Sequence, residues 1–147
     1  FFFLMRRTSS HLDFDLDTAK KQSSENPVYY VQYAHARILS ILRNSKISSR
    51  SPGLELGLLK EKEELELLKK IKQFSYILDV CCKTLDPYML TVYLQELAEA
   101  FHKFYDAHRV LGQEVKLTQA RLALLEGARI VIASALEILG VSLPQSM

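Results

Sequence analysis

A helix is predicted to begin inside one stretch, Asn26-Pro27-Val28-Tyr29-Tyr30-Val31-Gln32-Tyr33-Ala34-His35-Ala36-Arg37-Ile38. Asn26 can accept hydrogen bonds from the unpaired N–H groups of a first helical turn, and Pro27 has the φ angle that the first helical position needs. The apolar residues after it recur at steps of three and four and indicate one buried face: Val28, Val31, Ala34 or His35, Ile38, Ile41 and Leu42. The rest of the chain is expected to support this helix.

A second stripe, made of Tyr30, Tyr33 and Arg37, runs beside the apolar face. The stretch holds three tyrosines within five residues, and each ring buries well while its hydroxyl needs a polar partner. Aromatic stripes at helical spacing are usually core positions, with the hydroxyls at the rim. The same stripe could also present its rings to a ligand, and the pattern alone leaves both interpretations open.

This stretch resembles the helix that opens the anticodon-binding domain of arginyl-tRNA synthetases. The similarity covers nearly the whole chain, with residues 44–57 the least typical. Besides the helix start, it is carried by Phe2-Phe3-Leu4-Met5-Arg6-Arg7, His11-Leu12-Asp13-Phe14-Asp15-Leu16-Asp17, Ala120-Arg121-Leu122-Ala123-Leu124-Leu125, Leu139-Gly140-Val141 and Met147. The resemblance implies an RNA-recognising domain whose partners are tRNA(Arg) and the upstream catalytic domain of the same protein.

The resemblance also implies which residues border the anticodon loop. The family's tyrosines in this motif and the intervening Gln correspond to Tyr30, Gln32 and Tyr33, while Tyr105 and Met147 match two further residues on the same surface. The expected roles are stacking by the rings, base-edge reading by Gln32 and an adaptable apolar wall from Met147. Residues distant in sequence would then form one site.

Basic residues offer a second, weaker set of contacts. Arg37 is expected to be a phosphate or structural partner, and Arg43, Lys46 and Arg50 flank or lie in the predicted loop at 44–57. Scattered cations on a loop are more often simply solvated. The net charge of +2 is too small for charge alone to hold a polyanion, so RNA binding would also depend on stacking and shape.

Three further helices are predicted after the first, over residues 58–85, from Asp86-Pro87 to about Ala107, and from a Thr118 cap to Leu139, where Gly140 suits a left-handed cap. In the first of them the inward positions are expected to be Leu65, Leu68, Ile71, Phe74 or Ser75, Leu78, Cys81 or Cys82 and Leu85, with Glu64 among the outward charges. The next helix should bury Leu90, Leu94, Leu97, Phe101, Phe104 and Tyr105, and the last should be central, with Leu122, Leu125, Ile132, Leu136 and Leu139 apolar. The predicted fold class is an all-α bundle of four principal helices.

The chain is expected to divide into residues 1–25, the tail of the catalytic domain with a short helix from Leu16 to Ser23, and residues 26–147, the anticodon-binding domain. Its 147 residues, 48% of them hydrophobic, suffice for one globular core. Phe1 to Met5 lack the preceding basic residues of a signal peptide, and no apolar run reaches the ~18 residues of a membrane span. The chain is expected to begin inside a longer, cytoplasmic protein, with Cys81 and Cys82 reduced.

No residues in this chain are arranged for chemistry of their own. The four histidines and two cysteines lack metal-ligand spacing, and the acids Asp13, Asp15 and Asp17 lack the Gly and Glu of a calcium loop. There is no Gly-rich phosphate loop, so ATP with Mg²⁺ would be used only by the parent arginine–tRNA ligase, a class I synthetase, and this chain alone should be inactive. The alternatives are a helical protein-interaction module and the equivalent domain of a cysteinyl- or methionyl-type synthetase.

Overall fold

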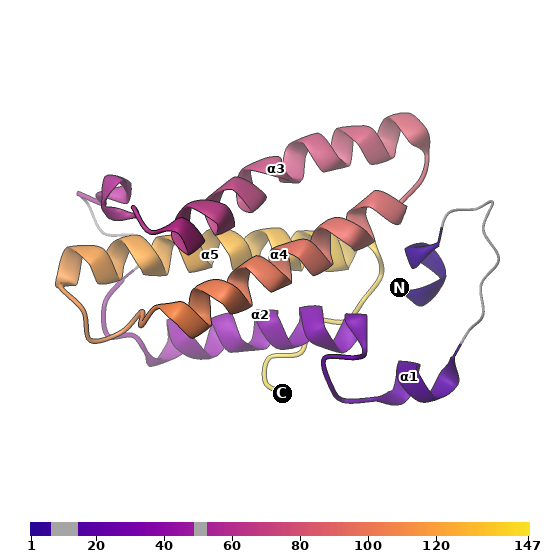
Figure 1. Ribbon diagram of the computed structural model, residues 1–147, viewed down its shortest axis with the longest axis horizontal. Helices are drawn as coiled ribbons and strands as arrows, with labels where there is room; N and C mark the ends of the chain where they lie inside the picture. The colour runs from indigo at the N-terminus through magenta and orange to yellow at the C-terminus, as the bar shows by residue number, and fades with distance from the viewer. Residues whose placement is uncertain (7–14, 49–52) are drawn as a thin grey trace.

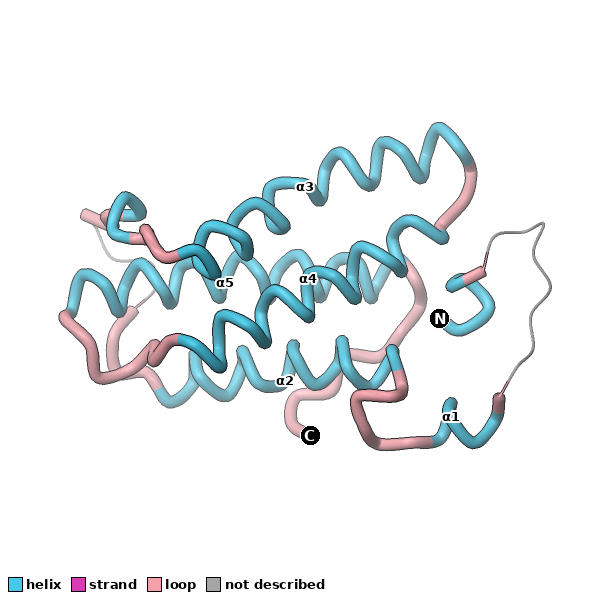
Figure 2. Tube along the Cα trace, viewed as in Figure 1, coloured by secondary structure: helices cyan, strands magenta, loops and turns pink. Residues whose placement is uncertain are grey.

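The computed structural model describes residues 1–6, 15–48 and 53–147, and every regular element in these ranges is helical (Figure 2). The helices are η1 (Phe2–Met5), α1 (Leu16–Lys20), α2 (Pro27–Asn44), η2 (Leu56–Leu58), α3 (Lys62–Thr84), α4 (Tyr88–Ala107) and α5 (Val115–Ile138). The all-α prediction with four principal helices, α2 to α5, is confirmed. None of the described helices is long and apolar enough to cross a membrane.

The four long helices pack around one core. Helix α4 contacts α2, α3 and α5, and α2 and α3 lie on opposite sides of the α4–α5 pair (Figure 1). The core is therefore filled from all four helices, with Ile38, Leu67, Phe101 and Leu125 among its fully buried side chains. η1 packs on α4, so the first residues of the chain also contact the bundle.

The predicted start of α2 is confirmed in detail. Oδ1 of Asn26 accepts hydrogen bonds from the backbone N–H groups of Val28 (3.0 Å) and Tyr29 (3.2 Å). Its Nδ2 donates to the carbonyl oxygens of Ala19 (3.0 Å) and Lys21 (2.9 Å), which explains how this polar side chain is buried. One residue thus caps α2 and ties the end of α1 to it.

Helix α5 contributes much of the core and then sends the chain back to α2. Leu122, Leu125, Ile132 and Leu136 are buried as predicted. Gly140 has φ +66°, and the backbone N–H of Val141 donates to Leu136 (2.9 Å), which is the glycine-terminated helix end that was predicted. The predicted Thr118 cap is wrong: the helix begins at Val115, and Thr118 is buried inside its first turns.

The predicted face of α3 is also wrong in its first and last turns. The helix begins at Lys62, not residue 58, and Leu65, Leu68 and Leu85 are exposed. The reason is Glu64, whose carboxylate accepts the backbone N–H groups just before the helix and fixes its phase. That phase turns Leu67 inward with Glu64, while Leu85 lies past the helix end with a left-handed φ of 53°.

Candidate nucleic-acid interface

A small pocket of about 260 Å³ lies between α2 and the C-terminal tail, residues 141–147. We call it the tail pocket. Helix α2 contributes Tyr33, Ala36, Arg37, Ser40, Arg43 and Asn44, and the tail contributes Gln145, Ser146 and Met147. The helical members follow steps of three and four, so they share one face of α2. The pocket thus combines an aromatic ring, a thioether, two guanidinium groups and several amide and hydroxyl groups.

Tyr33 and Met147 give this pocket exposed apolar surface. The exposed fraction is 36% for Tyr33 and 47% for Met147, so each could receive a planar ligand. The ring of Tyr33 also stacks with two other rings, those of Tyr29 (6.4 Å between centroids) and of His102 on α4 (5.9 Å). This support holds the ring in place while leaving part of it uncovered.

Arg37 connects the tail pocket to Tyr105. Its guanidinium donates a hydrogen bond to the Tyr105 hydroxyl and lies 4.9 Å from the centre of that ring. Tyr105 does not line the pocket itself; its half-buried ring stacks on Phe101 (5.9 Å) and borders a separate cavity at the start of the α4–α5 connection. The structural role expected of Arg37 therefore has a partner in Tyr105.

Tyr30 and Tyr33 pack against the same ring, that of His102. Tyr30 is half-buried and packs on His102 with 4.5 Å between ring centroids. Burial raises the pKa of its hydroxyl, and the negative charges of Glu99 and Asp106 raise it further, partly offset by Lys103. Tyr30 and Tyr33 both line a neighbouring cavity of about 430 Å³. Of the two, Tyr33 alone also reaches the tail pocket.

Gln32 faces the tail. Its amide nitrogen donates to the carbonyl oxygen (2.9 Å) and the hydroxyl (3.1 Å) of Ser142. Base-edge reading by Gln32 stays a prediction, and in this structure its N–H groups hold the tail. Lys46 is exposed just beyond the end of α2 and does not line the pocket, and Arg50 lies outside the described residues.

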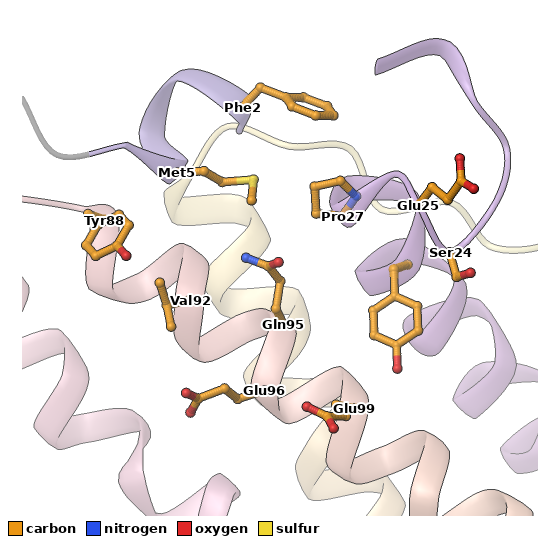
Figure 3. Close-up of a pocket in the computed structure, with 11 residues that line it drawn as sticks. Phe2, Met5, Ser24, Glu25, Pro27, Tyr88, Val92, Gln95, Glu96 and Glu99 are labelled. Carbon is orange, nitrogen blue, oxygen red and sulfur yellow. The ribbon is translucent and has the colours of Figure 1, made fainter. Parts of the chain in front are cut away.

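A much larger cavity, about 940 Å³, lies between η1, the start of α2 and α4. Figure 3 shows Phe2 and Met5 at one end of it and Glu96 and Glu99 at the other. A third carboxylate, Glu25, also lines it, whereas the described residues that line the tail pocket include two arginines and no acidic side chain. Like charges repel, so the larger cavity is the less suitable of the two for RNA phosphates.

More residues of the tail pocket could have been predicted from the sequence. Ser40 and Asn44 continue the steps of four, three and four that begin at Tyr33 and Arg37, so periodicity alone places them on this face. Gln145 and His102 carried no such signal, because their positions depend on how the tail and α4 pack against α2. Among the described residues, no group of three His, Cys, Asp or Glu side chains could hold a metal ion.

The fold is that of a class of all-helical modules found in arginyl-tRNA synthetases. The chain superimposes on a structure titled as a putative arginyl-tRNA synthetase from Campylobacter jejuni with a TM-score of 0.88, at 27% identity, over 99% of this chain and 32% of that one. The Thermus thermophilus arginyl-tRNA synthetase gives 0.83, at 26% identity, over 97% of this chain and 25% of that one. The chain belongs to the DALR anticodon binding domain family, whose model matches residues 31–147.

Sequence relatives agree with this family. The chain is 51% identical to an arginine–tRNA ligase of Dehalococcoides mccartyi over 149 aligned residues, and 50% identical to that of Citrifermentans bemidjiense over 151. Each alignment covers 100% of this chain and 27% of the relative. The chain therefore spans about a quarter of the length of the curated relatives it matches, and the comparisons favour none of the alternative families.

Proposed function

We propose that this chain recognises the anticodon of tRNA(Arg) as part of an arginine–tRNA ligase. The observation that supports this most directly is the tail pocket, where an exposed tyrosine and methionine lie beside the guanidinium of Arg37 and no acidic side chain. Single-stranded RNA is bound by such combinations, because rings stack on unpaired bases while cations meet the backbone.

In this proposal an unstacked anticodon base lies on Tyr33 and against Met147. Arg37 holds Tyr105 at the edge of the same surface and presents a cation to the loop. Tyr30 supports Tyr33 through their shared packing on His102. Lys46 and Arg50 follow α2 in sequence and are proposed to meet phosphates further along the RNA.

Arginine activation belongs, in the same proposal, to the part of the parent enzyme outside this chain. Residues 1–25 would be the tail of the upstream catalytic domain, and residues 26–147 would be the recognition domain. ATP and Mg²⁺ would be used in the part of the parent enzyme outside this chain. A cytoplasmic location of the parent belongs to this proposal too.

Replacing Tyr33 tests the proposed contact. Tyr33→Ala should weaken tRNA(Arg) binding by about 1–3 kcal/mol, as removal of a stacking ring does, while the melting temperature stays nearly unchanged. Tyr76→Ala is the matched control, because Tyr76 is a 66% exposed tyrosine on α3, outside the tail pocket. Binding is measured by fluorescence anisotropy and folding by circular dichroism. Equal affinities of the two variants, or early melting of Tyr33→Ala with unchanged binding, would make Tyr33 a core residue and refute its role.

A further inference from the structure

The last turn of α2 is fastened to the C-terminal tail by one side chain. Arg43 donates from Nη2 to the side-chain oxygen of Gln145 (2.6 Å) and from Nη1 to the Gln145 carbonyl oxygen (3.3 Å). No ion pair of Arg43 is found among the described residues, although Arg43 is exposed. The guanidinium is thus used on an amide and a backbone carbonyl two residues before Met147.

Among the described residues, Gln32 also donates hydrogen bonds from α2 to the tail, to Ser142. Val141 and Leu143 also pack on the core, so the tail is fixed to the bundle as far as residue 143. Beyond that point, the side-chain hydrogen bonds described between the tail and α2 are the two that Arg43 donates to Gln145, and the Pro144 backbone lies beside the His35 ring. The Arg43–Gln145 pair is therefore the last described hydrogen-bonded attachment before Met147.

Chain geometry shows how much this pair restricts Met147. From Gln145, two residues let the backbone of Met147 move within about 7 Å; from Leu143, four residues allow about 14 Å. The accessible volume grows with the cube of that reach, which lowers the effective concentration of Met147 at the pocket by about tenfold. A contact made by Met147 would weaken by a similar factor.

We propose that Arg43 is a positioning residue, which holds Gln145 so that Met147 lies in the tail pocket, and that it does not act by neutralising a phosphate. This rests on the proposed function, since Met147 must contact RNA for its position to matter. It deepens that function by giving the pocket a movable wall and naming the side chain that fixes it.

A double-mutant cycle separates this role from a direct RNA contact. We expect Arg43→Ala and Met147→Ala each to weaken tRNA(Arg) binding by about tenfold, given the estimate above. If Arg43 acts through Met147, Arg43→Ala/Met147→Ala should bind no more weakly than Met147→Ala alone, and Gln145→Ala should match Arg43→Ala. Multiplied losses in the double variant would overturn the proposal, because they indicate independent contacts.

The salt dependence of tRNA(Arg) affinity gives a second test with the same variants. Loss of one phosphate contact lowers the slope of log affinity against log salt concentration by about 0.7 for single strands. Arg43→Ala should leave that slope unchanged and increase the motion of the Met147 methyl group in NMR relaxation. A reduced slope with an unchanged methyl group would show that Arg43 binds phosphate, contrary to the proposal.

Two controls keep the outcomes distinct. Lys83→Ala removes a cation from the last turn of α3, away from the pocket, and should bind tRNA(Arg) as the wild type does. If Arg43→Ala and Met147→Ala bind normally while Tyr33→Ala does not, the positioning role fails and the proposed function stands. If Tyr33→Ala also binds normally, the proposed function fails with it.

Discussion

At the scale of single residues, Glu64 shows how a charge can be accommodated in this core. Its carboxylate accepts hydrogen bonds from the backbone N–H groups of Lys60 (2.9 Å) and Glu61 (3.0 Å) and from Nε of Arg121 (2.7 Å). Arg121 in turn donates to the carbonyl of Arg109 (2.7 Å). The Glu64–Arg121 pair joins the start of α3, the α4–α5 connection and α5, and both of its side chains are buried.

Glu64→Ala is expected to lower the free energy of unfolding by about 3–5 kcal/mol, because it leaves Arg121 as a buried charge without its partner. Glu66→Ala is the control: this glutamate is half-exposed, 4.0 Å from Lys62, and its removal should cost less than about 0.5 kcal/mol. Urea unfolding of the three proteins provides the measurement. Similar midpoints for the two variants would mean that Glu64 is solvated, as the sequence pattern had indicated.

The exposure of the individual tyrosine rings was only partly predictable from the sequence. Spacing predicted rim positions for Tyr30 and Tyr33 and a buried position for Tyr105, and all three pack on the core or on His102 with some surface left over. Which ring is most available could not be predicted, because it depends on α4. The ring of His102 covers Tyr30 more closely than Tyr33, and nothing in the spacing of α2 contains that information.

At the scale of elements, the apolar periodicity of α5 predicted its buried face but not its exposed one. Residues from Ile130 to Leu139 are apolar nearly all round, which suggested burial on every side. Ile130 and Ile138 are instead exposed, while Ile132 and Leu136 are fully buried. The difference arises because α5 packs against α2, α3 and α4 on the remaining sides only.

Paired substitutions on α5 test that orientation. Leu136→Ala should lower the free energy of unfolding by about 2–5 kcal/mol, since it leaves a cavity among fully buried neighbours. Ile138→Ala, two residues further along the same helix and 59% exposed, should change it by less than about 0.5 kcal/mol. Thermal and urea denaturation check both values. Comparable losses at the two positions would contradict the described packing of α5.

The four long helices were predictable from sequence because each combines a punctuating residue with a long apolar period, as at Asn26-Pro27 and at Gly140. The starts of α3 and α5 were not. At these starts a polar residue, Glu64 or Thr118, is buried for reasons of hydrogen bonding that periodicity does not encode.

At the scale of the whole molecule, two histidines link stability to pH. Both ring nitrogens of His35 and of His102 are buried and lack a hydrogen-bond partner among the described residues. Burial lowers the pKa of each below its ordinary value of 6.5. For His35, the backbone of Pro144 raises the pKa again in part, and the positive charge of Arg129 lowers it. For His102, the negative charge of Asp106 and the backbone of Ala98 both raise the pKa in part.

The unfolded chain therefore binds protons more readily than the folded one below pH 6.5, and stability should fall as the pH drops through that value until the folded pKa is passed. The melting temperature should be lower at pH 5.5 than at pH 7.5. In His35→Leu, which removes one of the two groups, the drop should be smaller. Equal drops in the wild type and His35→Leu would show that His35 does not contribute to this pH dependence.

Anticodon recognition by the tail pocket is the central claim, and one titration tests it most directly. The chain is titrated with tRNA(Arg), with the same tRNA carrying a changed anticodon, and with a non-cognate tRNA, at one salt concentration. We predict that the unaltered tRNA(Arg) binds at least about tenfold more tightly than the other two, equivalent to about 1.4 kcal/mol. Equal affinities for tRNA(Arg) and its anticodon variant would contradict the account.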